Sequence, residues 1–190
     1  MAFTVVYDAC VLYSEVLRDF LVRLANSSLV DGRWSARIVD EVAGAVFRKR
    51  PDLRERWLAP DGTRAKLLRA SREGPIENFS HLEGSFEGLP DPDDAHVIAA
   101  AVAAGAQVIV TSNLKDFPPD MLAKHFLEAQ DPDTFVLGLI DLDVAEVFAC
   151  LHAMAARRSK PPRTVDELLD ALERDLPASV ALLRASPLDD

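Results

Sequence analysis

Two short apolar runs constrain the fold of this chain more than any other feature. Phe3–Tyr7 ends abruptly at Asp8, and Val108–Val110 ends in the polar residues Thr111–Ser112–Asn113. Apolar, β-branched runs of this kind are typical of strands buried on both faces of a parallel sheet. Helical patterns lie between the two runs. The sequence therefore predicts a doubly wound α/β fold with a central parallel sheet, whose polar strand ends meet at the carboxyl edge.

Helical periodicity separates the predicted strands. It predicts one helix that begins near Ser14 and another that begins at an N-cap Ser35 and is ended by Pro51. A third helix is expected from the acidic turn at 91–94 to Ala104, with Gly105 ending it.

The remaining segments complete the predicted organisation. Residues 52–72 are expected to be helical and basic with a turn at 60–62, and the irregular stretch 74–90 to include a short strand at 76–79. Beyond Pro118 the pattern is mostly helical. The expected helices there are 134–142, 144–157, 165–174 and 178–184, with Pro161–Pro162 separating the last two from the rest. We expect an α/β domain over 1–130 and a helical extension over 131–190 that packs on it or contacts a partner.

Length, hydropathy and cysteine content narrow the class of protein. A chain of 190 residues supports one good core with a small appendage. No apolar run reaches the ~18 residues of a membrane span, and no basic flank precedes the N-terminal apolar stretch. We therefore expect no membrane association and a cytoplasmic location. Cys10 and Cys150 show no metal-ligand spacing and are expected to be reduced and buried.

Charge is distributed unevenly along the chain. The net charge of −10 argues against a nucleic-acid partner. However, Arg33–Arg72 holds eleven Lys and Arg against five Asp and Glu, whereas Glu73–Leu114 holds seven acidic residues and no Lys or Arg. One surface that binds an anionic polymer and another that binds a cation would account for this asymmetry, and so would two ordinary solvated helix faces.

Four segments carry acidic residues toward the predicted sheet edge: Asp8, Glu41, the turn Asp91–Asp94, and Asp116. Carboxylates held close together repel one another, and a hard divalent cation relieves that repulsion. Oxygen ligands without His or Cys indicate Mg²⁺ or Mn²⁺ rather than Zn²⁺. His96, two positions beyond Asp94, is expected to point away from it and to have a packing or surface role.

Each acidic residue also has a purely structural interpretation. Asp8 suits the cap of a turn, Glu41 suits an (i, i+4) ion pair with Arg37, and Asp116 suits a turn before Phe117. The turn Asp91–Asp94 suits the start of a helix, with an aspartate N-cap and a proline at the first helical position. Only the convergence of all four segments on one edge favours a common site.

Three segments resemble the PIN-domain family. Residues 6–13 (VYDACVLY) resemble its opening strand and turn, residues 89–106 (LPDPDDAHVIAAAVAAGA) its central acidic helix, and residues 108–118 (VIVTSNLKDFP) the strand and loop that carry its last acidic position. The resemblance covers roughly residues 1–126, and its three motifs are specific when taken together. It implies a three-layer α/β/α fold. Two departures stand out: relatives often have Asn or Ser where this chain has Cys10, and many have Asp where it has Asn113.

The resemblance also implies a function. It places metal-binding, catalytic acids at Asp8, Glu41, Asp94 and Asp116, with Asp91 and Asn113 nearby, and implies that a metal-activated water hydrolyses RNA phosphodiester bonds. It further implies the toxin half of a VapC-like toxin–antitoxin pair, hence an antitoxin partner, and leaves a homodimer open. Thr111 and Ser112 are candidates to hold the water or a phosphate oxygen, or simply satisfy a strand-end turn.

The basic segment is the predicted RNA surface. The cationic residues that follow the helix of Glu41 are Arg48, Lys49, Arg50, Arg54 and Arg56. A second candidate RNA surface surrounds Arg157, Arg158 and Lys160.

Three other classes of protein are alternatives to a nuclease. A non-catalytic PIN-like binding module is left open by Cys10 and Asn113. A phospho-accepting receiver domain needs an acidic pair early in the chain, which Asp8 lacks, and a lysine at a later strand end, whereas Lys115 lies inside a loop. A haloacid-dehalogenase phosphatase needs a second aspartate where Cys10 stands.

Overall fold

The central feature of the molecule is a parallel sheet of four strands. In this computed structural model, which describes residues 3–157 and 164–186, the strands run in the order β2-β1-β3-β4. Their bounds are β1 Phe3–Tyr7, β2 Val30–Arg33, β3 Val108–Val110 and β4 Glu128–Gln130. All three neighbouring pairs are parallel. The predicted α/β fold with a central parallel sheet is confirmed.

Two of these strands, β2 and β4, were not predicted. Their sequences, VDGR and EAQ, lack an apolar run. They are strands because their backbones pair with β1 and β3, in the registers Phe3↔Val30 and Val108↔Glu128. Gly32 shows how closely β2 is packed: a Cβ atom there would lie 2.5 Å from Ala25 Cβ. The strand predicted at 76–79 was wrong, since in the described part of that segment only the isolated bridge Ser35↔Ile76 forms.

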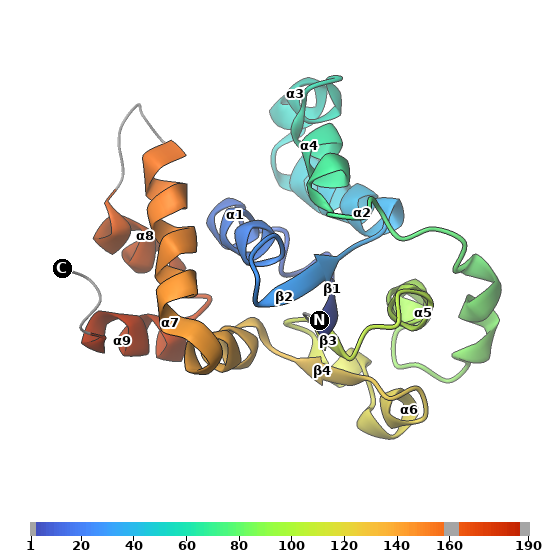
Figure 1. Cartoon of the computed structure of the whole chain (residues 1–190). Coiled ribbons are helices and arrows are strands. Elements are labelled where there is room, and N and C mark those ends of the chain that lie inside the picture. The colour runs from blue at the N-terminus through green and yellow to red at the C-terminus, as the bar shows by residue number, and fades with distance from the viewer. Residues whose placement is uncertain (1–2, 158–163, 187–190) are drawn as a thin grey trace.

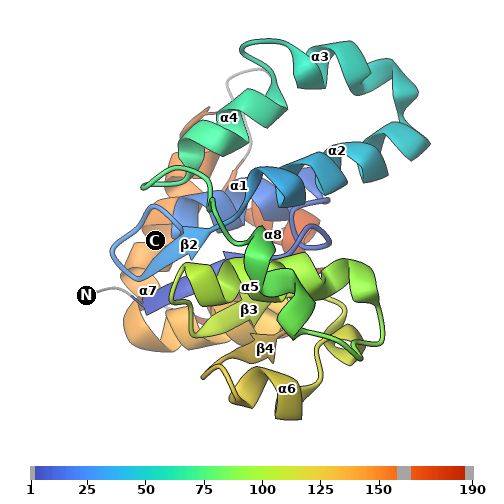
Figure 2. The same ribbon diagram turned by 90° about the vertical axis from the view of Figure 1, so that its right-hand side faces the viewer.

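Helices cover both faces of the sheet (Figure 1). The helix α1 lies on one side, against β2, and α5 lies on the other, against β1 and β3. The C-terminal helices α7, α8 and α9 lie outside α1. The helix α3 lies beyond the far end of α2, and α4 runs back along α2 (Figures 1 and 2). The helix bounds are α1 Glu15–Leu24, α2 Ala36–Lys49, α3 Arg54–Leu58, α4 Thr63–Ala70, α5 Ala95–Ala103, α6 Pro119–Ala123, α7 Pro132–Arg157, α8 Val165–Leu172 and α9 Pro177–Ala185.

The helix starts follow the predicted signals. Ser14 is the N-cap residue of α1, and the Ser35 hydroxyl accepts a hydrogen bond from Ile38 N at the start of α2. Gly105, at φ +62°, follows the end of α5, where a left-handed conformation favours glycine.

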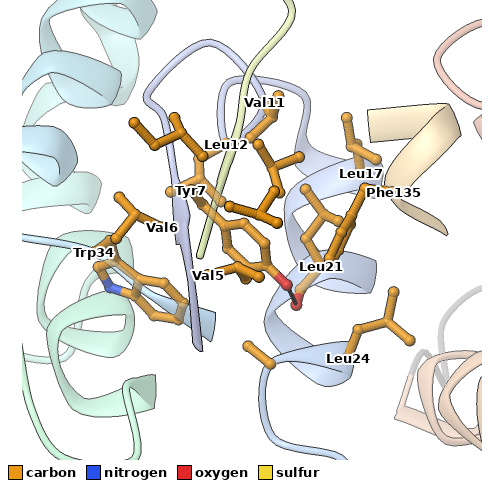
Figure 3. Close-up of a cluster of buried hydrophobic side chains, with 14 of the residues drawn as sticks. Val5, Val6, Tyr7, Val11, Leu12, Leu17, Leu21, Leu24, Trp34 and Phe135 are labelled. Carbon is orange, nitrogen blue, oxygen red and sulfur yellow. Dashed lines mark hydrogen bonds between the residues drawn. The ribbon is translucent and has the colours of Figure 1, made fainter. Parts of the chain in front are cut away.

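A cluster of aromatic side chains joins the sheet to the C-terminal helices (Figure 3). The Tyr7 ring stacks on Trp34 with centroids 6.0 Å apart, and it meets Phe135 of α7 edge-on at the same distance. The Tyr7 hydroxyl donates a hydrogen bond to Leu21 O across 3.2 Å. The helical extension therefore shares a core with the α/β part rather than hanging from it.

The extension contains the predicted helices. The helix α7 breaks at Asp143, whose φ of −161° is extended, and so corresponds to the two helices expected on either side of that residue. Asp133 near the start of α7 holds α9: its two carboxylate oxygens accept hydrogen bonds from the backbone N–H groups of Ala178 and Ser179, each across 2.8 Å. The predicted separator Pro161–Pro162 lies outside the described residues.

Across residues 3–157 and 164–186, none of the helices combines the length and the apolar character that a membrane crossing requires.

Candidate functional site

Asp8 lies at the carboxyl end of β1, where three hydrogen bonds fix its carboxylate. Its side chain is buried. The oxygen Oδ1 accepts from Ala9 N across 2.6 Å, and Oδ2 accepts from Thr111 Oγ1 across 2.8 Å and from Cys10 Sγ across 3.0 Å. Because Thr111 directly follows β3, residues from two neighbouring strands hold this one carboxylate. Thr111 thus orients Asp8 and also satisfies the strand-end turn, since its Oγ1 accepts from Asn113 N.

Cys10 is part of the same network. Burial, together with the Asp8 carboxylate, raises the pKa of the Cys10 thiol to about 12, so the sulfur keeps its proton and donates to Asp8. The sulfur in turn accepts from Ser112 N across 3.1 Å. Both cysteines are free, as predicted. Cys150 is buried, but Cys10 is only partly buried, because it faces the sheet edge.

Asp91 and Asp94, in the acidic turn before α5, have different roles. The Asp91 carboxylate accepts from Asp93 N across 3.0 Å and caps a single 3-10 turn, Pro92–Asp94. The helix α5 then begins at Ala95, and the Asp94 side chain makes no capping hydrogen bond. The capping interpretation therefore holds for Asp91 and not for Asp94.

Asp94 lies in the electrostatic field of other acids. Its partial burial, and then the carboxylates of Asp8, Asp91 and Asp116, raise its pKa to about 7, whereas His96 lowers it. A carboxyl group whose pKa is raised by burial and by like charges is typical of functional sites. Asp8 and Asp116, two of the other three predicted acids, are thus near enough to Asp94 to influence it.

Asp116 reaches this edge from the loop after β3. It ends the 3-10 turn Leu114–Asp116, and its backbone N–H donates to Asn113 O across 2.9 Å. The Asp116 side chain is partly buried, whereas Ser112 and Asn113 are exposed. Ser112 and Asn113 therefore lie beside the carboxyl edge of the sheet, with side chains accessible to solvent.

Glu41 has two basic side chains, Arg37 and His96, as its neighbours. Its Oε1 lies 3.7 Å from Arg37 Nε, the predicted (i, i+4) pair, and 2.6 Å from His96 Nε2. His96 is buried, and within the described chain neither of its ring nitrogens has a partner with hydrogen-bond geometry. The 2.6 Å contact between His96 Nε2 and Glu41 Oε1 therefore lacks hydrogen-bond geometry. His96 lies next to Glu41, a position that helix periodicity alone did not reveal.

The acids do not form a closed cage. Within the described ranges, no three His, Cys, Asp or Glu side chains converge closely enough to hold a metal ion. The donor set nevertheless fits a hard cation, because it consists of carboxylate oxygens and the charges of Asp8, Asp91 and Asp116 raise the pKa of Asp94. A divalent cation bound there would offset that repulsion.

Two cavities border this edge, and Cys10 and Tyr13 line both. One, of about 460 Å³, lies between the edge and α2 and is also lined by Glu41, Arg48 and Lys49. The other, of about 380 Å³, lies between the edge and the C-terminal helices. The acidic edge thus opens toward the basic segment on one side and toward the extension on the other.

The predicted basic residues differ in their surroundings. Arg48, Lys49 and Arg56 are exposed, and Lys49 Nζ lies 5.2 Å from the centroid of the Tyr13 ring. Arg54 stacks over Phe47 at 5.4 Å. Arg50 donates two hydrogen bonds to the Asp52 carboxylate. Of the second candidate surface, Arg158 and Lys160 lie outside the described residues.

Comparison with known proteins gives two family matches and one relative. The family model described as "PIN domain" matches residues 4–115, and the one described as "VapC50 C-terminal domain" matches residues 132–185. A protein of Mycobacterium tuberculosis (strain ATCC 25618 / H37Rv), named "Putative ribonuclease VapC50", is 43% identical over 91 residues. The match covers 48% of this chain and 54% of that protein, so the chain spans about half of its relative's length. No solved structure matches the chain significantly.

Proposed function

The chain belongs to the PIN-domain family, and on this premise we propose that it is a divalent-metal-dependent endoribonuclease that serves as the toxin of a toxin–antitoxin pair. The observation that carries the proposal is the position of Asp8, Asp94 and Asp116 at the carboxyl edge of the sheet, where Asp8 is held by Thr111 and the neighbouring carboxylates raise the pKa of Asp94 to about 7. Like charges around Asp94 disfavour its ionised state, and a bound cation would relieve this. The similarity to a relative named as a ribonuclease supports RNA as the substrate.

The residues that would hold the cation are Asp8, Asp94 and Asp116, with Glu41 completing the set from α2. The cation, Mg²⁺ or Mn²⁺, would lower the pKa of the attacking water and neutralise charge on the phosphoryl oxygens. The protein supplies placement. Thr111 and Cys10 hold Asp8 by hydrogen bonds to Oδ2, and Ser112 and Asn113 offer exposed polar groups beside it.

His96 has a place in this scheme as a positioning residue. It is buried, it lies 2.6 Å from Glu41, and it lowers the pKa of Asp94. Its contact with Glu41 from a buried position would help to hold that carboxylate in place.

RNA would approach over the basic segment. Arg48 and Lys49 line the cavity that also contains Glu41 and Cys10, so a phosphate bound by the two cations would lie next to the acidic edge. Arg54 and Arg56 extend the positive surface along α3. Arg50 contributes less, because Asp52 already occupies its guanidinium.

The division of the chain supports the toxin proposal. We place the boundary between a nuclease domain, 1–130, and a C-terminal helical domain, 131–190, which agrees with separate matches to a PIN domain and to a VapC50 C-terminal domain. An antitoxin protein is the expected partner, as the similarity to VapC50 suggests.

A non-catalytic RNA-binding module is the second candidate. One observation favours it: both oxygens of Asp8 already accept hydrogen bonds, from Ala9, Thr111 and Cys10. These three hydrogen bonds use three of the carboxylate's roughly four lone-pair positions, which leaves one on Oδ1 for a cation.

The deciding experiment is a cleavage assay. Purified protein is incubated with structured and unstructured RNAs in Mg²⁺, in Mn²⁺ and in EDTA. We expect divalent-dependent cuts in unpaired regions, lost in Asp8→Asn, Asp94→Asn and Asp116→Asn and kept in Asp120→Asn, an exposed acid on α6. Cleavage that survives EDTA would exclude the mechanism, and binding without cleavage in any metal would establish the second candidate.

A further inference from the structure

The cavity between the acidic edge and the C-terminal helices has no part in the proposed catalytic scheme. It has a volume of about 380 Å³, in the range of sites that bind small ligands. Cys10 and Ser112 border it on the side of the sheet edge, and Arg174 and Pro177 border it on the side of the extension. Anything bound there would therefore touch both units of the chain and lie beside Asp8.

The walls of this cavity suit a flat ring. Tyr13 lines it with a partly exposed aromatic side chain, and Leu17, Pro132 and Pro177 add apolar surface. The Arg174 side chain is 84% exposed and stands at the cavity with its Nε bound to Asp175, so its planar guanidinium is accessible to a bound ring. Proteins hold unstacked RNA bases between aromatic rings and arginine planes in this way.

The polar groups of the cavity are mainly acceptors. Two of its aspartates have structural tasks: Asp131 caps α7 through Asp133 N and Thr134 N, and Asp133 binds the start of α9. Asp175 differs. Its Oδ1 accepts one hydrogen bond, from Arg174 Nε across 3.2 Å, and its side chain is 20% exposed. It is the carboxylate best placed to accept a further hydrogen bond from a ligand.

The charge of this cavity excludes a phosphate and favours a base. Three aspartates and one arginine line it, next to an already acidic edge. A phosphate would be repelled there, whereas a base is neutral. Carboxylates accept hydrogen bonds from the exocyclic amino groups of cytosine, adenine or guanine, and uracil has no such group.

We propose that this cavity binds one unpaired RNA base next to the cleaved bond, stacked on Tyr13 beneath Arg174, with Asp175 selecting bases that carry an amino group. The inference rests on the proposed ribonuclease function and deepens it. It assigns a function to the C-terminal region, because Arg174 and Asp175 line the base-binding pocket next to the acidic edge of the sheet. Phosphates on either side of that base would be held by Arg48 and Lys49 across the edge.

The test separates binding from cleavage. The wild-type cut site is mapped first. Binding is then measured in an Asp94→Asn background in EDTA, using oligoribonucleotides that differ only in having A, C, G or U at one position flanking the cut. At one such position the three amino-bearing bases should bind roughly fivefold or more tighter than U. Asp175→Ala should remove that preference and leave U-containing RNA nearly unaffected.

Stacking is tested with a second set of variants. Tyr13→Ala should weaken all four RNAs roughly tenfold or more, and Tyr13→Phe should not, because it keeps the ring. Arg174→Ala should weaken them about threefold. Arg184→Ala, which removes an arginine of α9 outside the cavity, should leave binding unchanged. Arg174 is largely exposed and Asp175 is partly exposed, so their substitution carries less risk of unfolding than Tyr13→Ala does.

The two proposals fail differently. An unaltered base preference in Asp175→Ala, or unaltered affinity in both Tyr13→Ala and Arg174→Ala, overturns the base pocket while wild-type cleavage stands. If wild-type protein cuts no RNA in Mg²⁺ or Mn²⁺, the proposed function itself fails and the pocket falls with it.

Discussion

The acidic edge and the basic segment are opposite in charge and also in how they are held. At the acidic edge, Asp8 is buried and its two oxygens accept from three donors. On the basic segment, Arg48, Lys49 and Arg56 are exposed and lie on helices that extend away from the sheet (Figure 2). The acidic edge holds a carboxylate in a fixed position, whereas the basic segment contributes positive charge at the surface.

This difference fits two separate demands of cutting an RNA chain. Placing a cation against a scissile bond requires carboxylate oxygens that are held in position by their neighbours. Attracting a polyanion requires only positive charge near the path, because phosphate contacts act through counterion release and carry no sequence information. Substitutions in the first region should therefore act through geometry, and those in the second through charge.

Among substitutions of residues that support the acidic edge without binding the cation, Thr111→Val should cause the largest loss of metal affinity. It removes the hydroxyl that donates a hydrogen bond to Asp8 Oδ2 across 2.8 Å and accepts one from Asn113 N. Loss of an outer partner of a metal ligand typically costs about 10–100-fold in metal affinity or activity. The measurement is a Mg²⁺ titration of cleavage rate, whose midpoint should rise.

Two variants make this test specific. Thr111→Ser keeps the hydroxyl and should restore the midpoint, and Thr63→Val makes the same change on α4 and should not move it. A loss of rate with an unchanged midpoint, or no recovery in Thr111→Ser, would show that Thr111 supports the fold rather than the metal site.

Charge reversal on the basic segment should have a smaller, sequence-independent effect. Lys49→Glu combined with Arg48→Glu should weaken RNA binding about tenfold at low salt. The log–log salt slope should decrease by roughly 0.7 for each lost contact with single-stranded RNA. Arg50→Glu should do less, because Asp52 already binds that guanidinium. Lys124→Glu, at the end of α6 on the other side of the sheet, controls for net charge.

An unchanged slope in the double variant would contradict the proposed path. RNA would then have to reach the acidic edge over another surface of the molecule. Metal affinity measured in parallel should stay the same in every one of these variants, which distinguishes them from Thr111→Val.

The sequence revealed the parts of this site that sit at strand ends. Asp8 and Thr111 could be found because each directly follows an apolar run, and parallel strands end at one edge. The strands β2 and β4 could not, since VDGR and EAQ have no apolar pattern and become strands only by pairing with β1 and β3. Tertiary pairing overrides local propensity in such short segments.

Contacts between helices were equally invisible along the chain. The position of His96 beside Glu41 depends on how α5 packs relative to α2, which helix periodicity does not encode. The cavity at Tyr13 and Arg174 brings together residues far apart in the sequence. The acidic turn is an intermediate case: its capping signal was recognised, but only the structure shows that Asp91 caps while Asp94 faces the other acids.

The smallest expected effect is on stability, and it separates a site residue from a cap. In the folded protein the pKa of Asp94 is raised to about 7, whereas an unfolded chain gives a value of about 3.9. Below pH 4 both states are protonated, and Asp94 costs no stability. Between about pH 4 and 7 the folded state retains a proton that the unfolded state has lost, so the free energy of unfolding falls as pH rises. Above pH 7 the loss is complete.

Asp94→Asn should therefore stabilise the metal-free protein at pH 8 and have little effect near pH 4. Since Asp94 is partly exposed, solvent screening reduces the expected gain to about 1 kcal/mol, or a rise in Tm of about 2–4 °C for a chain of this size. Thermal unfolding in EDTA at both pH values measures it, with the exposed Asp93→Asn as the matched control. A helix cap behaves in the opposite way, because its loss destabilises by about 0.5–2 kcal/mol. Asp94→Asn or Asp94→Ala that unfolds at lower temperature at pH 8, yet still cuts RNA, would return Asp94 to a structural role and leave the acidic edge without its central carboxylate.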